Sequence, residues 1–313
     1  MKDLCFAAID IGSNAVRLSV KSIRTDAAGK PRPEQQLLIR FPLRLGKEAF
    51  TKGKISEPAV KQLLHLMKSF QQMLKVFPLT AFRACATAAM RDARNGEQIA
   101  LRIRKKTGIP VEIISGEEEA RLVYAAHIDR SLREGNGFMY MDVGGGSTQV
   151  SLIRDGEVIF SHSFDIGTVR MMTFRVEDKE KTAFLTALKS LREQYPDFKL
   201  VGSGGNINKL YRLLKENNCI LNVEKLRLLN KELTGMLVDE RMTKYKIKRD
   251  RAEVIGYAAD IFVHAAEAMR IDDILVPSIS LCDGIIDNAC AQYYVLSDAH
   301  SSIAEFSRAC VSE

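Results

Sequence analysis

Two short stretches, Asp10-Ile11-Gly12-Ser13-Asn14 and Asp142-Val143-Gly144-Gly145-Gly146-Ser147-Thr148, decide how this chain is expected to fold. Each places an aspartate at the end of an apolar run and then turns through glycine and small hydroxyl or amide side chains. Glycine lets backbone N–H groups converge on one point, and such concave turns bind phosphate oxygens. Either stretch alone would be read as an ordinary strand-ending turn. Because the arrangement occurs twice, we interpret the pair as phosphate-binding loops.

The segments around the two stretches also repeat. Each half opens with a strand, a glycine-rich turn and two more strands, predicted over 4–11, 15–23 and 35–45 and over 138–143, 150–153 and 158–164. Alternating helices and strands follow, and the last helices are predicted over 232–245, 251–269 and 283–295. The repeat predicts two abutting α/β domains with a cleft between them. A length of 313 residues, above the usual limit of one hydrophobic core, agrees with two domains.

The aspartates at the two turns favour a metal ion. A carboxylate about 4 Å from one phosphate charge is repelled by roughly 4 kcal/mol at an effective dielectric of ~20. A hard divalent cation with oxygen ligands, most plausibly Mg²⁺, would bridge aspartate, water and phosphate. Arg17, Arg91 and Arg170 follow turns of this kind and could share the phosphate charge, although each one alone is more often a surface ion-pair residue.

Three consecutive glutamates, Glu117, Glu118 and Glu119, open a predicted helix after Ser115-Gly116. One interpretation is that these carboxylates only stabilise the N-terminal end of the helix dipole. The other is that one of them points into the cleft and takes a proton from an attacking water. The sequence leaves both open. Other phosphate motifs fail: Gly53-Lys54 lacks the remaining P-loop residues, and Gly202 to Ile207 departs from the dinucleotide fingerprint at Ile207.

The amino-acid composition limits the classes of ligand and the cellular compartment that we expect. Lysine and arginine (46) outnumber aspartate and glutamate (39), so the net charge of +7 favours anionic ligands. Aromatic residues make up only 7% and tryptophan is absent, so we expect no nucleic-acid partner. No apolar run approaches the length of a membrane span or a signal peptide, and we expect no membrane association. The six cysteines are scattered without a C-x-x-C pair, which indicates a cytoplasmic protein.

Taken together, five segments resemble the exopolyphosphatase/guanosine pentaphosphate phosphatase (Ppx/GppA) family: Asp10–Asn14, Thr87–Asn95, Ser115–Leu122, Asp142–Thr148 and Gly202–Gly205. The resemblance implies an α/β fold of two actin-like (ribonuclease-H-like) domains with a phosphate-binding cleft between them, in the short, two-domain form. The domains are expected over 1–124 and 125–289, with a C-terminal helix over 290–313 packing back on the first. Homodimers are common among relatives and are expected here.

The resemblance also implies roles for particular residues. Glu119, directly before Ala120-Arg121, would be the general base, and Asp142 with Asp10 would hold Mg²⁺. The residues implied to bind phosphate are Gly12, Ser13, Asn14, Arg17, Arg91, Gly144, Gly145, Gly146, Ser147 and Arg251. The implied reaction is removal of the terminal orthophosphate from inorganic polyphosphate, from guanosine pentaphosphate, or from both.

One departure from the family pattern concerns the metal. The family often has glutamate after Ser147-Thr148, whereas this chain has Gln149, a neutral amide, which puts metal affinity in doubt. Two alternative functions therefore stay open. One is a guanosine tetra- or pentaphosphate-binding regulator with weak turnover. The other is a sugar-kinase-like phosphotransferase, which would need an adenosine pocket and an acceptor site.

Overall fold

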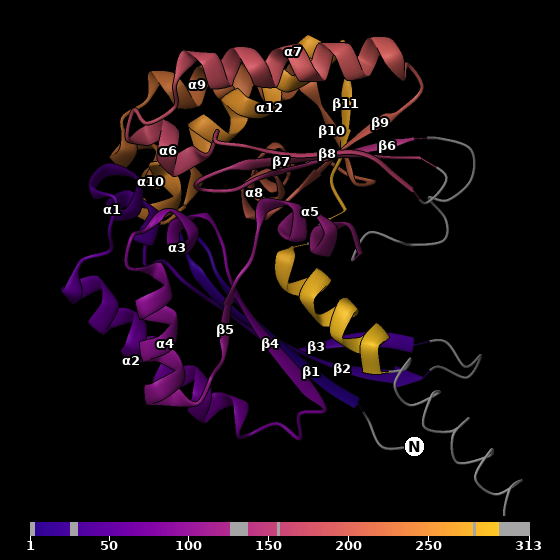
Figure 1. Ribbon diagram of the computed structural model, residues 1–313. Coiled ribbons are helices and arrows are strands. Elements are labelled where there is room, and N and C mark those ends of the chain that lie inside the picture. The colour runs from indigo at the N-terminus through magenta and orange to yellow at the C-terminus, as the bar shows by residue number, and fades with distance from the viewer. Residues whose placement is uncertain (1–3, 26–30, 126–136, 155–156, 278–279, 294–313) are drawn as a thin grey trace, which may run out of the picture.

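The computed structural model describes residues 4–25, 31–125, 137–154, 157–277 and 280–293. Its strands form two separate sheets, one from each half of the chain (Figure 1). Among the described residues, no helix combines the length and the apolar character needed to cross a membrane.

The first sheet has the strand order β3-β2-β1-β4-β5. Strands β1, β2 and β3 are antiparallel neighbours, and β4 and β5 run parallel to β1. The strands are β1 (Leu4–Ile11), β2 (Val16–Thr25), β3 (Pro31–Phe41), β4 (Ala81–Ala86) and β5 (Val111–Ile113). The helices of this half are α1 (Leu45–Lys52), α2 (Glu57–Leu74), α3 (Ala88–Asp92), α4 (Gly96–Thr107) and α5 (Gly116–Ala125).

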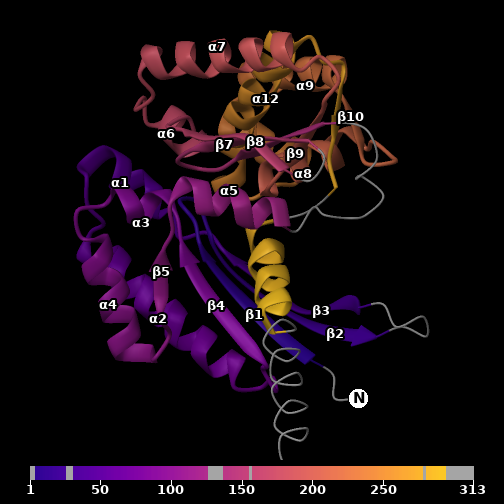
Figure 2. The ribbon, with the colours of Figure 1, turned by 45° about the vertical axis from the view of Figure 1, so that its right-hand side comes forward.

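Strand alternation decides which way Asp10 points. Ala7, Ile9 and Ile11 on β1 pack in the core with α2 and α4. Phe6 and Ala8 instead pack in a second cluster with α5 and with the helical residues 281–293. Because successive strand residues face opposite sides, Asp10 lies on the face of Phe6 and Ala8, toward α5. Figure 2 shows α5 lying between the two sheets.

The second sheet has the order β10-β11-β9-β6-β7-β8. Its strands are β6 (Phe138–Val143), β7 (Thr148–Arg154), β8 (Glu157–Phe164), β9 (Lys199–Ser203), β10 (Ile220–Asn222) and β11 (Asp273–Leu275). Read from β8, three antiparallel strands are followed by the parallel strands β9 and β11, as in the first sheet, and β10 is added at the edge. The prediction of two actin-like α/β domains is therefore confirmed.

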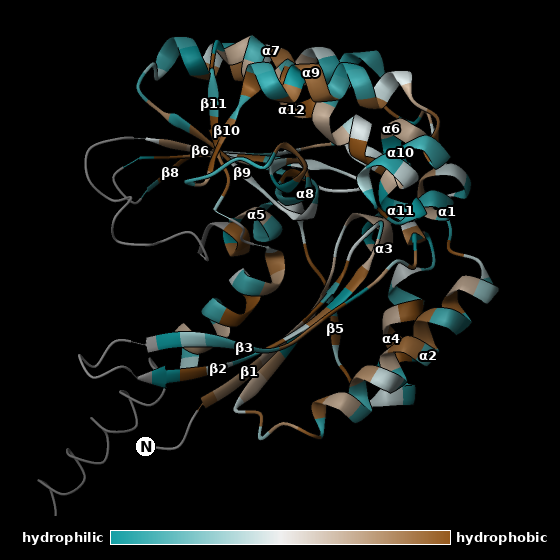
Figure 3. Ribbon diagram, turned by 180° about the vertical axis from the view of Figure 1, so that it is seen from behind, coloured by the Kyte–Doolittle hydropathy of each residue, from teal (hydrophilic) through white to brown (hydrophobic). Residues whose placement is uncertain are grey.

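The helices of the second half are α6 (Thr168–Met172), α7 (Asp178–Gln194), α8 (Gly205–Leu214), α9 (Val223–Gly235), α10 (Val238–Tyr245), α11 (Arg249–Ala252) and α12 (Ile255–Met269). Of these, α7, α9 and α12 pack on one face of the sheet. Met139, Met141 and Val143 of β6 join the large core with α7, α9 and α12. In Figure 3, α12 is largely hydrophobic and lies beneath the more polar α7. Asp142 therefore faces away from this core, as Asp10 does in the first half.

Several predicted boundaries were wrong. The strand predicted over 35–45 is β3, which starts at Pro31 and ends at Phe41, so that α1 begins at Leu45. The helix predicted over 232–245 is two helices, α9 and α10, because the backbone is extended at Met236 and Leu237. Residues 294–313 of the predicted C-terminal helix lie outside the described residues, while residues 281–286 contribute to the cluster on the first sheet. The domain limits 1–124 and 125–289 stay a prediction.

Candidate active site

The two glycine turns have the same backbone geometry. In the first, the Gly12 N–H donates to the Ala15 carbonyl at 3.1 Å, and in the second the Gly144 N–H donates to the Ser147 carbonyl at 2.9 Å. We call residues 12–15 loop 1 and residues 144–147 loop 2. The sequence repeat is thus a repeat of turn structure at the end of β1 and of β6.

Each loop is held by backbone hydrogen bonds from residues near the start of a helix. Near the start of α1, the N–H groups of Arg44 and Gly46 donate to the carbonyls of Asn14 (3.1 Å) and Ser13 (2.8 Å). At the start of α6, the N–H groups of Thr168 and Val169 donate to the carbonyls of Gly144 (3.0 Å) and Gly145 (2.8 Å). Because the carbonyls are bonded on this side, the N–H side of each loop is left for an anion.

The loops face each other across the domain boundary. A Cβ atom placed on Gly145 would lie 2.8 Å from the Ser13 Cβ, closer than real Cβ contacts allow, so only glycine fits at this approach. The two loops share one pocket of about 70 Å³. The predicted site residues that line it are Asp10, Gly12, Ser13, Asn14, Arg17, Glu119, Asp142, Gly144, Gly145, Gly146, Ser147 and Arg251.

Glu119 is the one of the three glutamates that lines the pocket. Its side chain is 15% exposed, and its Oε2 lies 3.7 Å from Arg91 Nη1 and 3.2 Å from Gln149 Nε2. Burial raises the pKa of Glu119 to about 8; Asp142 and Asp10 add to the rise, and Arg91 opposes it. Glu118 instead bonds Arg83 at 2.6 Å. A carboxyl group with a pKa near neutrality in a phosphate-sized pocket has the properties of a general base.

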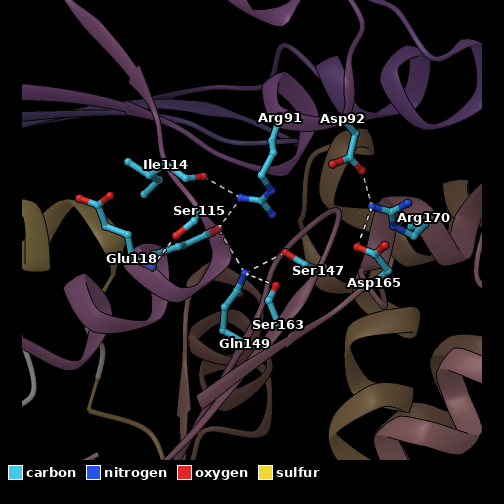
Figure 4. A network of polar contacts seen from close by, with 11 residues as sticks. Arg91, Asp92, Ile114, Ser115, Glu118, Ser147, Gln149, Ser163, Asp165 and Arg170 are labelled. Carbon is cyan, nitrogen blue, oxygen red and sulfur yellow. Dashed lines mark hydrogen bonds and ion pairs between the residues drawn. The ribbon is translucent and has the colours of Figure 1, made fainter.

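Arg91 and Arg170 differ from the other candidate arginines. Arg91 does not line the pocket; it donates to the Ile114 carbonyl at 2.9 Å (Figure 4). Its Nη1 lies 3.7 Å from Glu119 Oε2. Arg170 bonds Asp92 at 2.6 Å and the Gly146 carbonyl at 2.8 Å, and its guanidinium stacks on Phe50. Arg170 therefore ties α6 and loop 2 to the first domain rather than facing the pocket.

A row of charges crosses the first sheet at the pocket. The strand register pairs Asp10 with Arg17 and Arg17 with Arg40, and Arg17 forms an ion pair with Asp10. Arg40 also lines the pocket and bonds Asp250 of α11 at 2.7 Å. The sequence analysis missed Arg40. The pairing register of the hairpin formed by β2 and β3 places Arg40 beside Arg17 and could have identified it.

Three guanidinium groups gather on this side of the pocket, and two of them, Arg17 and Arg40, have a carboxylate partner. Burial lowers the pKa of Arg251 to about 10, and the neighbouring Arg40 and Arg17 lower it further. The carboxylates of Asp10 and Asp250 offset part of the repulsion among these groups, and an anion bound between them would offset more. The arrangement suits a phosphate group.

The carboxylates offer oxygen ligands for a cation. Burial raises the pKa of Asp142 to about 6, and repulsion from Asp10 acts in the same direction. Within the described ranges, no group of three or more His, Cys, Asp or Glu side chains is arranged to hold a metal ion. Mg²⁺, however, is usually bound by one or two carboxylates, with water and substrate phosphate completing its shell. Asp142 and Asp10 fit that donor set.

Two ribonuclease-H-like sheets with facing glycine loops define the class of protein: a two-domain α/β protein of the actin-like type. Residues 37–292 match the sequence model of the Ppx/GppA phosphatase family, and the chain belongs to that family.

A curated relative and two solved structures agree with this family assignment. Exopolyphosphatase 1 of Mycobacterium tuberculosis is 31% identical over 163 residues, which are 52% of this chain and 46% of that protein, so the chain spans about half the length of the curated relatives it matches. A solved Ppx/GppA family member of Aquifex aeolicus has a TM-score of 0.73 at 24% identity, covering 93% of this chain and 99% of that chain. A solved exopolyphosphatase of Cytophaga hutchinsonii has a TM-score of 0.78 at 24% identity, covering 90% of this chain and 96% of that chain. These structures agree with the fold.

Proposed function

We propose that this chain is a phosphohydrolase that removes the terminal orthophosphate from inorganic polyphosphate. The observation that carries the proposal is that Glu119, with its raised pKa, lines the same pocket as both glycine loops and Arg251. The family and the exopolyphosphatase relatives support this reaction class.

The residues divide the chemistry as follows. Glu119 takes one proton from a water whose oxygen attacks the terminal phosphorus. The new P–O bond forms as the bond to the next phosphate breaks, and orthophosphate and a shortened chain leave. The N–H groups of the loops and the guanidinium groups of Arg17, Arg40 and Arg251 stabilise the charge on the phosphoryl oxygens. Mg²⁺, held by Asp142 and Asp10, would supply further charge neutralisation.

A basic groove favours polyphosphate over a nucleotide. The groove has a volume of about 460 Å³ and shares Arg17, Arg40, Gly205, Arg251 and Ser280 with the pocket. Its basic lining residues are Arg17, Arg40, Lys209, Arg212, Lys246, Lys248 and Arg251. The apolar lining residues are Leu38 and Ile247, so among the described lining residues no aromatic ring is available to stack a purine. A bare phosphate chain matches this lining better than guanosine pentaphosphate or the adenosine of a kinase substrate.

Phosphate release measured side by side on long polyphosphate, short polyphosphate and guanosine pentaphosphate, with and without Mg²⁺, tests the proposal. We expect release from polyphosphate without any acceptor. Release from guanosine pentaphosphate alone would reassign the substrate. ATP-dependent phosphorylation of an acceptor would favour the phosphotransferase instead.

Lys209→Ala is expected to raise KM for long polyphosphate more than for short polyphosphate, by several-fold at low salt. Burial lowers the pKa of Lys209, and the neighbouring Arg251 and Arg212 act in the same direction, so this ammonium lies among like charges that a polyanion would relieve. Lys231→Ala, an exposed position on α9 outside the groove, is the charge-matched control. Equal KM changes in both variants would contradict a chain-binding role for the groove.

The pH dependence of turnover follows from Glu119. A general base works only when deprotonated, so kcat/KM is expected to rise with pH and to level off above about 8, the pKa to which burial raises this carboxyl. Arg91→Gln removes the charge that lowers this pKa, and the rise should move to higher pH. A profile that is flat between pH 6 and 9 in both proteins, an interval of about one unit or more on each side of that pKa, would contradict the assignment of Glu119.

A further inference from the structure

Arg170 holds the carbonyl side of loop 2. Its backbone N–H donates to the Gly145 carbonyl at 3.1 Å, and its side-chain Nε donates to the Gly146 carbonyl at 2.8 Å. The N–H groups of Thr168 and Val169 hold the remaining contacts on this side. The carbonyls of all three glycines of loop 2 are thus hydrogen-bonded by the start of α6, and one of these bonds depends on the Arg170 side chain.

The same guanidinium is bound by the first half of the chain. It lies 2.6 Å from Asp92 Oδ2 on α3 (Figure 4), and it stacks over the Phe50 ring of α1, 4.5 Å from the ring centroid. The other carboxylate in contact, Asp165 at 3.3 Å, belongs to the second half and is mostly exposed. The Arg170 side chain is 12% exposed, so little water competes for its charge and these partners fix its position.

The Phe50 ring lies against the supports of both loops. A Cβ atom placed on Gly146 of loop 2 would lie 2.5 Å from Phe50 Cζ. A Cβ atom on Gly46, whose N–H donates to the Ser13 carbonyl of loop 1, would lie 2.7 Å from Phe50 Cε2. Because a cation is attracted to the face of an aromatic ring, the Arg170 guanidinium holds α6 against this ring.

From these contacts, we infer that Arg170 is a positioning residue: by joining α6 and loop 2 to α1 and α3, it sets the distance between the two phosphate-binding loops. Among the described residues, those that line the pocket do not include Arg170, so it acts through loop 2 and not on phosphate directly. The inference rests on the proposed phosphohydrolase function, in which both loops must hold the terminal phosphoryl group while it is transferred.

This role predicts a larger effect on kcat than on KM. The basic side chains of the groove lie on other elements, among them Lys209 and Arg212 of α8 and Arg251 of α11. Binding of the phosphate chain in the groove should therefore survive a shift of loop 2. Alignment of the terminal phosphoryl group with the attacking water should not survive it.

Arg170→Ala is expected to lower kcat for phosphate release from polyphosphate about 10- to 100-fold, as for a small displacement of reacting groups, with KM changed by no more than about two-fold. Arg170→Lys keeps the charge beside Asp92 but loses the planar fork that reaches Asp92 and Gly146 together, so its kcat should lie between those of Arg170→Ala and the wild type. Asp92→Asn should lower kcat in the wild-type background and have no further effect in Arg170→Ala, because the two groups act as one unit.

Arg175→Ala is the matched control. This arginine follows α6 in the chain and also reaches α1, through a 3.3 Å contact with the Thr51 carbonyl, but it is exposed. An exposed hydrogen bond competes with water and contributes little, so kcat and KM should stay within about two-fold of wild type. Thermal unfolding of each variant identifies those that lose activity only because they lose structure.

The outcomes separate failure of the inference from failure of the proposed function. With an active wild type, folded Arg170→Ala that keeps wild-type kcat would overturn only the positioning role. If its calorimetric affinity for polyphosphate of defined length, measured with Mg²⁺, is also weaker, Arg170 binds phosphate instead. If Arg170→Ala does not fold, Arg170→Lys and Asp92→Asn decide by the same criterion. Wild-type protein that releases no phosphate from polyphosphate would overturn both proposals.

Discussion

Glu119→Gln is expected to lower kcat for phosphate release from polyphosphate by about 10²- to 10⁴-fold, the usual contribution of a general base. The amide cannot take the proton of the attacking water, yet it fills the same space. Loop 1, loop 2 and the arginines are unchanged, so polyphosphate affinity should be retained. Rates of phosphate release together with calorimetric titration check both parts.

Glu118→Gln provides the matched control. Its side chain is the neighbouring carboxylate on α5, but it bonds Arg83 and Figure 4 shows it directed away from Gln149 and Ser147. This variant should keep near wild-type turnover. Comparable losses in the two variants would mean that α5 needs its negative charges for structure, and Glu119 would lose its assignment as the base.

Gly167→Ala is expected to lower kcat/KM by about 100-fold, because a small displacement of reacting groups costs that much. A Cβ atom here would lie 2.4 Å from the Gly146 carbonyl carbon and 2.5 Å from the Gly145 carbonyl oxygen, which are backbone atoms of loop 2. No side chain can move to make room, so loop 2 or α6 must shift. The strain should also lower the free energy of unfolding by about 1–3 kcal/mol.

Gly235→Ala is the control for this change. Gly235 is the last residue of α9, and a Cβ atom there meets nothing within 4 Å. Steady-state kinetics and denaturant unfolding should show nearly wild-type values for this variant. If Gly167→Ala also behaves as wild type, loop 2 is not held by the close approach of α6.

The parts that the sequence predicted are those with strong periodicity. Alternation along β1 and β6 and the paired turns indicated that Asp10 and Asp142 occupy equivalent places, and the structure brings both to one pocket. Helical spacing did not distinguish Glu119 from Glu117 and Glu118, because the choice depends on where α5 packs. Glu119 was assigned as the base only through the resemblance to the Ppx/GppA family.

The parts that the sequence did not predict depend on short segments and tertiary contacts. Helices α1 and α6, of eight and five residues, have too few turns for a period to show. The residue before α1, Arg44, has a positive φ of 58°, and no sequence pattern indicated this conformation in a non-glycine residue. The role of Arg170 as a tie between domains also required the positions of Asp92 and Phe50.

The register of β2 has a consequence for how the protein could evolve. Arg17 and Ser19 face the cleft side, while Val16, Leu18 and Val20 belong to the core beneath. Inserting one residue before Arg17 would exchange the two sets, burying a guanidinium among aliphatic groups and turning valines toward the substrate. Along β2, residues of the groove thus alternate with residues of the core. An insertion or deletion that shifts the strand register therefore changes both sets at once.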